Sequence, residues 1–150
     1  MTAHYLCHVV FSAKDLERSI SFYRGLFGFK EVGHIFNGVA AAVISGRTHY
    51  ELWLIQVGDA SGPPSGTRRS FYHIGIKVEA NLDELRVAKK ELEQADVMID
   101  GMNDHMVSQS LYLQGPDGNE VELYVDADES VWKNNPESVF ARIKPLRLQK

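Results

Sequence analysis

The chain has little that would direct it out of the cell or into a membrane. Its single cysteine, Cys7, cannot form an internal disulfide, and its first residues lack the basic, apolar and small-residue pattern of a secretion signal. No apolar run approaches the roughly 20 residues that a membrane-spanning helix requires. We therefore expect a cytoplasmic protein with no membrane partner, in which Cys7 acts as a small buried apolar residue.

Clustered basic residues are also missing. The formal net charge is −4, and the most basic stretch is the pair Arg68-Arg69 inside a Gly/Pro/Ser segment. Nucleic acid is excluded as the main partner, because its phosphates require clustered lysines and arginines. What is present is the composition of a soluble globular protein, with 44% apolar and 24% charged residues in 150, enough for one domain with a substantial core.

Two stretches of the chain begin and end alike. The first opens with His8-Val-Val-Phe and closes with Glu51-Leu-Trp-Leu, and the second opens with His73-Ile-Gly-Ile and closes with Glu122-Leu-Tyr-Val. Each places a histidine near its start and a carboxylate near its end, inside apolar segments with strand character. An unpaired imidazole or carboxylate is costly to bury there, and metal coordination would offset that cost.

The first stretch predicts the order strand, helix and three strands. Its helix has capping-box spacing in Ser12-Ala-Lys-Asp15, one apolar face and Gly28 as a stop signal. Asn37-Gly38 predicts a two-residue hairpin. The four strands are expected at residues 5–11, 31–36, 39–45 and 49–57.

The second stretch repeats this order after a segment of linker composition at 58–70. Its helix begins near Asn81, with Glu84 three residues on, and Gly115-Pro-Asp-Gly-Asn119 is a turn. The strands are expected at residues 71–78, 97–100, 108–114 and 119–125. We therefore divide one domain, 1–150, into module 1 (about 4–57), the linker 58–70, module 2 (about 71–126) and a tail. The tail, 127–150, is polar and aperiodic, and we expect it to pack along the surface or against a neighbouring subunit.

These motifs resemble the vicinal oxygen chelate superfamily, which includes glyoxalase I, extradiol dioxygenases and the fosfomycin- and bleomycin-resistance proteins. The resemblance covers nearly residues 5–126 and is closest to single-domain catechol 2,3-dioxygenase-like proteins. It implies an α+β fold in which two βαβββ modules form an open, cup-shaped mixed β-sheet with helices outside. The phrases that carry it are His8-Val-Val-Phe, Asp15 to Tyr23, Leu26-Phe-Gly-Phe29, His73-Ile-Gly-Ile and Gly115 to Tyr124.

The resemblance also implies a metal site on the concave face, held by His8, His73 and Glu122. Two imidazoles and one carboxylate leave three positions of an octahedral Fe(II) or Mn(II) ion open, enough for a bidentate substrate and O2 together. Glu120 shares a strand face with Glu122. We assign the ligand to Glu122, because Glu120 abuts the turn and is expected to be solvated.

The end of module 1 leaves two branches of the superfamily open. Glu51 as a fourth ligand indicates an isomerase or epimerase of glyoxalase I type, with Ni(II), Co(II) or Zn(II). Alternatively, His49-Tyr50-Glu51 resembles a segment of extradiol dioxygenases whose second residue is a catalytic acid or base and whose acidic residue is no ligand. Tyr50 and Glu51 point to opposite faces of a strand, so only one can face the metal. With an ordinary pKa near 10, Tyr50 is a poor proton shuttle.

Two residues of module 2 favour the dioxygenase. Tyr112 stands where extradiol enzymes carry a tyrosine that contacts the bound catechol oxygen, and His105 lies in a segment that resembles their histidine-containing loop. We therefore expect a homodimeric extradiol-type dioxygenase acting on a small catecholic aromatic and O2, with Tyr112, His105 and Tyr50 as candidate catalytic residues. The alternatives are a glyoxalase- or epimerase-type lyase or isomerase, and a bleomycin-resistance-type binding protein. A fosfomycin-type transferase ranks lowest, because the strand after His8 lacks the threonine of that family.

Overall fold

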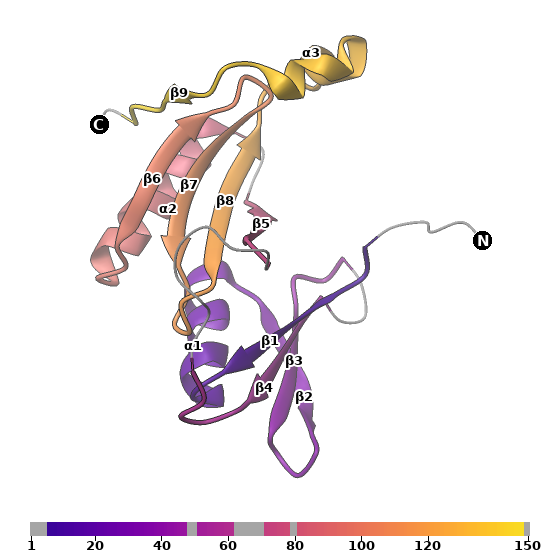
Figure 1. The fold of residues 1–150 in the computed structure, drawn as a ribbon. Helices are drawn as coiled ribbons and strands as arrows, with labels where there is room; N and C mark the ends of the chain where they lie inside the picture. The colour runs from indigo at the N-terminus through magenta and orange to yellow at the C-terminus, as the bar shows by residue number, and fades with distance from the viewer. Residues whose placement is uncertain (1–5, 48–50, 62–70, 79–80, 149–150) are drawn as a thin grey trace, which may run out of the picture. The chain divides into compact units, whose positions relative to one another are not determined.

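The computed structural model describes residues 6–47, 51–61, 71–78 and 81–148. Its contacts divide the chain into two compact units (Figure 1). Unit 1 comprises Met1–Gly66 with Gly115–Gly118, and unit 2 comprises Thr67–Gln114 with Asn119–Lys150. None of the helices in these ranges is long and apolar enough to cross a membrane.

Unit 1 contains the first βαβββ module. Its sheet has the order β1-β4-β3-β2, with β1 parallel to β4 and the other pairs antiparallel. The helix α1 packs on this sheet and buries Leu16, Ile20 and Tyr23. The elements are β1 (Val9–Ala13), α1 (Leu16–Phe27), β2 (Lys30–Ile35), β3 (Ala40–Ile44) and β4 (Leu52–Gln56).

Helix α1 ends as predicted but begins differently. Gly28 adopts the left-handed conformation, with φ 67°, and its N–H donates to the carbonyl of Arg24, which confirms the stop signal. The N-cap is Asp15, whose carboxylate accepts from the N–H of Arg18, so the prediction that placed Ser12 at this position is wrong. Ser12 is unavailable because β1 continues through it to Ala13.

The predicted two-residue hairpin at Asn37-Gly38 is also wrong. Ile35 pairs with Ala40, so the turn between β2 and β3 has four residues, and Phe36, Asn37 and Gly38 all have positive φ. Two successive hydrogen bonds, from the N–H of Gly38 to Ile35 and from that of Val39 to Phe36, close this wider turn. The two flanking apolar residues therefore belong to the turn instead of to the strands.

Unit 2 contains the second βαβββ module and the tail. Its sheet has the order β5-β8-β7-β6-β9. The helix α2 packs against β7 and β8 and begins after Asn81, whose side chain accepts from the N–H groups of Asp83 and Glu84, as predicted. The elements are β5 (His73–Lys77), α2 (Leu82–Gln94), β6 (Ile99–Asp104), β7 (Ser108–Gln114), β8 (Glu120–Asp126), α3 (Glu129–Asn134), the 3-10 helix η1 (Pro136–Phe140) and β9 (Lys144–Pro145).

The tail packs on its own unit, one of the two places expected for it. Its strand β9 pairs antiparallel with β6, and the N–H of Leu146 donates to the carbonyl of Met102 over 3.0 Å. The structure is thus α+β with two βαβββ modules, as predicted. Most of the expected linker, 58–70, lies outside the described residues. The single domain with one cup-shaped sheet stays a prediction.

Candidate functional site

The strand β8 has one apolar and one polar face. Val121, Leu123 and Val125 are buried on the side that α2 covers, whereas Glu120 and Glu122 alternate with them and are only partly buried. Because successive side chains of a strand point to opposite faces, the two glutamates share the face away from α2. The candidate site therefore begins as the polar face of β8.

The neighbouring strands bring two more candidate residues, His73 and Tyr112, to the same face. β8 lies between β5 and β7, and its register pairs Glu120 with His73 and Glu122 with both Gly75 and Tyr112. Paired residues in adjacent strands point to the same side of the sheet. Residues almost 50 positions apart in the sequence therefore meet, which is how the fold assembles a site from separate motifs.

The imidazole of His73 lies between the two carboxylates. Its Nε2 is 3.3 Å from Oε2 of Glu122, and its Nδ1 is 3.3 Å from Oε1 of Glu120. The expectation that Glu120 is solvated is wrong, because its side chain is only 28% exposed and its Oε1 is buried. The cause is pairing on both sides, with His73 on β5 and Gln114 on β7, which covers the residue although it follows a turn.

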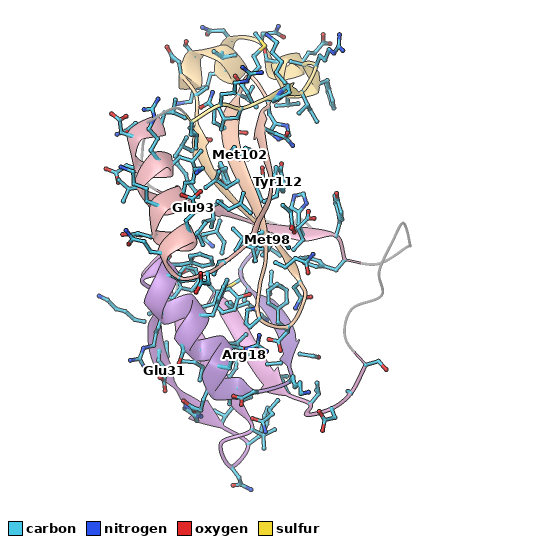
Figure 2. The ribbon with its side chains drawn as sticks, turned by 90° about the vertical axis from the view of Figure 1, so that its left-hand side faces the viewer. Arg18, Glu31, Glu93, Met98, Met102 and Tyr112 are labelled. Carbon is cyan, nitrogen blue, oxygen red and sulfur yellow. The ribbon has the colours of Figure 1, made fainter. Side chains whose placement is uncertain are left out.

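Tyr112 joins this group to His105. The Tyr112 hydroxyl donates to Oε1 of Glu122 over 2.9 Å, and Nε2 of His105 lies 2.8 Å from the same hydroxyl (Figure 2 shows where Tyr112 lies). A phenol has one proton to donate, so Nε2 of His105 must carry a proton and act as the donor. Burial, followed by the Glu122 carboxylate, raises the pKa of Tyr112 well above its usual value. The hydroxyl therefore stays protonated at neutral pH.

Gly75 leaves space for these groups. A Cβ at this position would lie 3.6 Å from Oε2 of Glu122 and 3.4 Å from the ring of Tyr124, so a methyl group would fill the remaining gap and a longer side chain would displace the carboxylate. The sequence analysis did not single out Gly75. A glycine inside an apolar strand was the available signal, because it often marks a close approach.

Of three other predicted residues, the structure describes two. His8 is exposed, directly before β1 in unit 1, and Tyr50 lies outside the described residues. Cys7, which we expected to be buried, is partly exposed. The ligand His8 and the catalytic residue Tyr50 stay predictions.

Glu51 is held by its own unit. Its carboxylate accepts from the N–H and the hydroxyl of Ser45, both at 2.6 Å, and from Nε of Arg47 at 3.0 Å. Burial alone would raise the pKa of Glu51, but these hydrogen bonds and the Arg47 charge outweigh it and lower the pKa. The carboxylate therefore has its charge and its oxygens satisfied without a metal.

The donor set around His73 suits a divalent metal. Imidazole and carboxylate ligands fit Fe(II), Mn(II) and Zn(II), and two ligands at right angles around such an ion lie about 3 Å apart, near the 3.3 Å between His73 Nε2 and Glu122 Oε2. His73 Nδ1 and Glu120 Oε1 are buried without a hydrogen bond in the described part of the chain. In that same part, no group of three His, Cys, Asp or Glu is arranged to hold a metal, and His8 belongs to the other unit. The three-residue ligand set stays a prediction.

Comparison with known proteins places this fold and these residues in a family. The sequence model of the Glyoxalase/Bleomycin resistance protein/Dioxygenase superfamily matches residues 5–123. Among solved structures, a glyoxalase/dioxygenase from Nostoc punctiforme superposes with a TM-score of 0.70 at 17% identity, covering 85% of this chain and 100% of that one.

Two curated relatives carry different activities in their names. A catechol-2,3-dioxygenase of Bacillus subtilis (strain 168) is 31% identical over 127 residues, which are 85% of this chain and 43% of the relative. The metallothiol transferase FosB of Lysinibacillus sphaericus (strain C3-41) is 32% identical over 126 residues, 83% of this chain and 84% of the relative. The chain thus spans less than half of the dioxygenase. The transferase branch, which we ranked lowest, matches it equally well in identity.

Proposed function

The chain belongs to the Glyoxalase/Bleomycin resistance protein/Dioxygenase superfamily, and within it we propose an extradiol-type dioxygenase that cleaves a catecholic aromatic with O2. The observation that carries this proposal is the hydrogen-bonded series from His105 through Tyr112 to Glu122. His105 and Tyr112 are the two residues whose sequence positions favoured the dioxygenase. Their side chains meet beside Glu122, a predicted metal ligand. The B. subtilis relative supports the same reaction.

We assign the metal to His8, His73 and Glu122. When bound, Fe(II) or Mn(II) would hold the two vicinal oxygens of the substrate beside O2 and allow electrons to pass between them. Oε1 of Glu122 accepts the Tyr112 proton, whereas Oε2 faces His73, so the two oxygens of this carboxylate have separate tasks. A homodimer in the cytoplasm remains part of the prediction.

Tyr112 and His105 handle the substrate and its protons in this proposal. The Tyr112 hydroxyl remains a neutral donor that can turn from Glu122 to an oxygen on the aromatic ring. Nε2 of His105 lies 2.8 Å from that hydroxyl, so a His105 imidazolium could pass one proton to the hydroxyl or to the ring-opened product and become a neutral imidazole. This proposal gives the acid role to the imidazole of His105, because imidazole is the side chain most often used for general acid–base catalysis.

The surroundings of Glu51 argue against the lyase or isomerase alternative. That mechanism needs Glu51 as a ligand or base, but Ser45 and Arg47 already occupy its carboxylate. A lowered pKa also makes this carboxylate a weaker base for removing a proton from a substrate. We therefore favour three protein ligands over four.

A metallothiol transferase is the second candidate. It is supported by the L. sphaericus relative, of which the chain covers 84%. The same three ligands would serve it, but it gives His105 and Tyr112 no evident task. Substituting His105 or Tyr112 therefore separates the two candidate functions.

The test is purification under anaerobic conditions, elemental analysis, and assay against a small panel. Catechols report ring cleavage as yellow products, an epoxide with a thiol reports transfer, and a hemithioacetal reports glyoxalase activity. We expect iron or manganese and yellow products that depend on O2. Nickel or zinc with isomerase turnover, or thiol transfer without O2 uptake, would overturn the proposal.

A further inference from the structure

Glu120 has no task in the proposed reaction, although it lies against a predicted ligand. We propose that it is a positioning residue: it accepts a hydrogen bond from Nδ1–H of His73 and so fixes the imidazole tautomer that leaves Nε2 free for the metal. This inference rests on the proposed function, because it takes His73 as a ligand. It assigns no contact with substrate to Glu120.

The register and the burial both point to this pair. His73 and Glu120 are directly paired across β5 and β8, and Nδ1 and Oε1 lie 3.3 Å apart. Both atoms are buried, and within the described residues neither makes a hydrogen bond in good geometry. Each is therefore an unsatisfied polar atom 3.3 Å from the other, and a turn of the imidazole that improves the angle would form the hydrogen bond.

The two carboxylates beside His73 lie next to different nitrogens of its ring. The other ring nitrogen, Nε2, faces Oε2 of Glu122, whose Oε1 is already engaged by Tyr112. A neutral imidazole carries one N–H, so a nitrogen that ligates a metal must leave its proton on the other nitrogen. Metal-bound histidines commonly donate that second N–H to a carboxylate, which orients the ring and makes the ligand more basic. Glu120 is placed to accept it.

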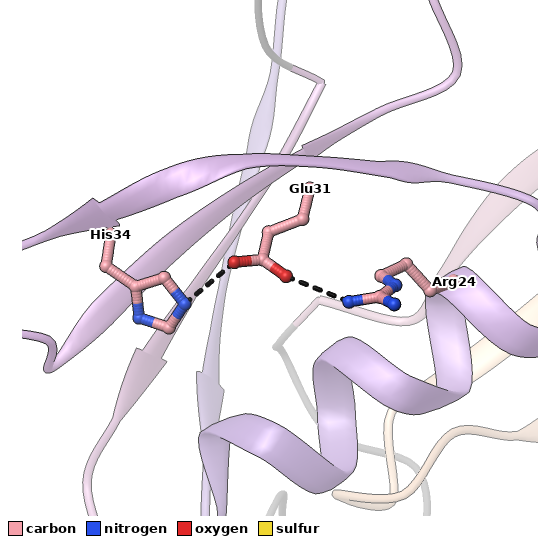
Figure 3. Close-up of polar contacts among 3 residues, drawn as sticks. All are labelled: Arg24, Glu31 and His34. Carbon is pink, nitrogen blue, oxygen red and sulfur yellow. Dashed lines mark hydrogen bonds and ion pairs between the residues drawn. The ribbon is translucent and has the colours of Figure 1, made fainter.

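The chain contains a matched pair without this role. In unit 1, Oε1 of Glu31 lies 2.9 Å from Nε2 of His34, and its Oε2 accepts from Nη1 of Arg24 at 3.1 Å (Figure 3). A bulge in β2 at this point brings Glu31 and His34 to the same side. Glu31 thus resembles Glu120 in chemistry and in having a histidine neighbour, but it lies outside the candidate site and serves as a control.

The experiment compares Glu120→Met, Glu120→Gln and Glu31→Met in the full chain. Methionine keeps the length of the side chain and removes the acceptor, whereas glutamine keeps an oxygen that can accept from Nδ1–H. The dissociation constants for Zn(II) and Fe(II) are measured by competition with a chelator. We expect Glu120→Met to weaken binding by about 10- to 100-fold, Glu120→Gln to recover most of that loss, and Glu31→Met to leave affinity unchanged.

A second readout needs no variant. In the zinc-loaded wild-type protein, nitrogen-15 NMR should show a proton on Nδ1 of His73 and none on Nε2. Zinc bound through Nδ1 would overturn the inference even if the methionine variant failed to fold. So would wild-type affinity in Glu120→Met, which would leave the proposed function intact. Complete loss of metal in both Glu120 variants would make Glu120 a ligand instead, and a wild-type chain that binds no metal would contradict the proposed function itself.

Discussion

The two modules share an element order but differ in the use of the carboxylates at the start of β4 and in β8. In unit 1, Glu51 is bound by Ser45 and Arg47, two residues of the preceding loop. In unit 2, Glu120 and Glu122 face the imidazole of His73, and Glu122 also binds Tyr112. One module thus uses its carboxylate to secure a loop, whereas the other keeps two carboxylates around a histidine.

The strand registers explain why the sequence repeat overstates the symmetry. Val9 pairs with Leu52, so Glu51 comes one residue before the first pair of β1 and β4, level with His8. In unit 2 the residue level with His73 is Glu120, not Glu122. By register the counterpart of Glu122 is therefore Trp53. Similar phrases in the two modules do not place their glutamates at equivalent positions.

Removing Glu122 should have the largest effect. In Glu122→Ala, His73 loses the carboxylate beside its Nε2, and only imidazoles remain among the three proposed ligands, so we expect metal retention and ring cleavage to fall to background. Elemental analysis after gel filtration measures the first, and product absorbance measures the second. Stoichiometric Fe(II) in the variant would show that the ligand assignment is incorrect.

Tyr112→Phe should lower turnover while the metal stays bound. The substitution removes only the hydroxyl that lies between His105 and Glu122, so the substrate oxygen loses a donor. We expect kcat to fall by roughly ten- to a thousand-fold at unchanged metal content. Steady-state kinetics on a catechol, with metal analysis of the same sample, checks this. Unchanged kcat would remove the main support for the dioxygenase.

Asp117 tests how far unit 1 depends on a segment from the second module's sequence. It lies in Gly115–Gly118, which clusters with unit 1, and its carboxylate accepts from the Lys14 N–H at 2.7 Å and from the buried Ser19 hydroxyl at 2.6 Å. We expect Asp117→Ala to lower the free energy of unfolding by about 1–3 kcal/mol, because the Ser19 hydroxyl loses its partner. Urea denaturation measures this loss.

The control is Asp59→Ala. Its carboxylate pairs with the Lys14 ammonium at 2.8 Å, but the side chain is 90% exposed, so the change should be near zero. Equal losses in the two variants would mean that Asp117 is no more than a surface charge.

Glu51→Gln should have the smallest effect on activity. If Glu51 only secures its loop, ring cleavage should stay within about twofold, and the unfolding free energy should fall by about 1 kcal/mol or less at pH 7. Because the pKa of Glu51 is lowered in the folded chain, its contribution is present above its ordinary value of 4.5 and is lost as pH falls through the lower folded value. The deficit of the variant should therefore disappear in acid. A collapse of activity would instead favour the lyase or isomerase.

The sequence predicted the parts of the site that depend on apolar and polar residues alternating along a strand. Because β8 alternates between apolar and acidic residues, the shared face of Glu120 and Glu122 could be read from the sequence, as could the caps at Asn81 and Gly28. The burial of Glu120 could not, because it depends on pairing with strands on both sides.

The hydrogen-bond partners of Glu51 could not be predicted from the sequence either. They come from Ser45 and Arg47, and nothing in a linear sequence indicates which loop residues fold back onto a strand end. Contacts set by neighbouring strands and loops are the part that required the structure.

The site that includes His73, Tyr112 and Glu122 is proposed to support O2-dependent ring cleavage. The most direct measurement is oxygen uptake by the Fe(II)-loaded chain, prepared without air, after catechol is added. We predict one O2 consumed per catechol, with a yellow product that takes up both oxygen atoms, and no uptake in Glu122→Ala. No uptake by an iron-loaded, folded wild-type chain across a panel of catechols would contradict the claim.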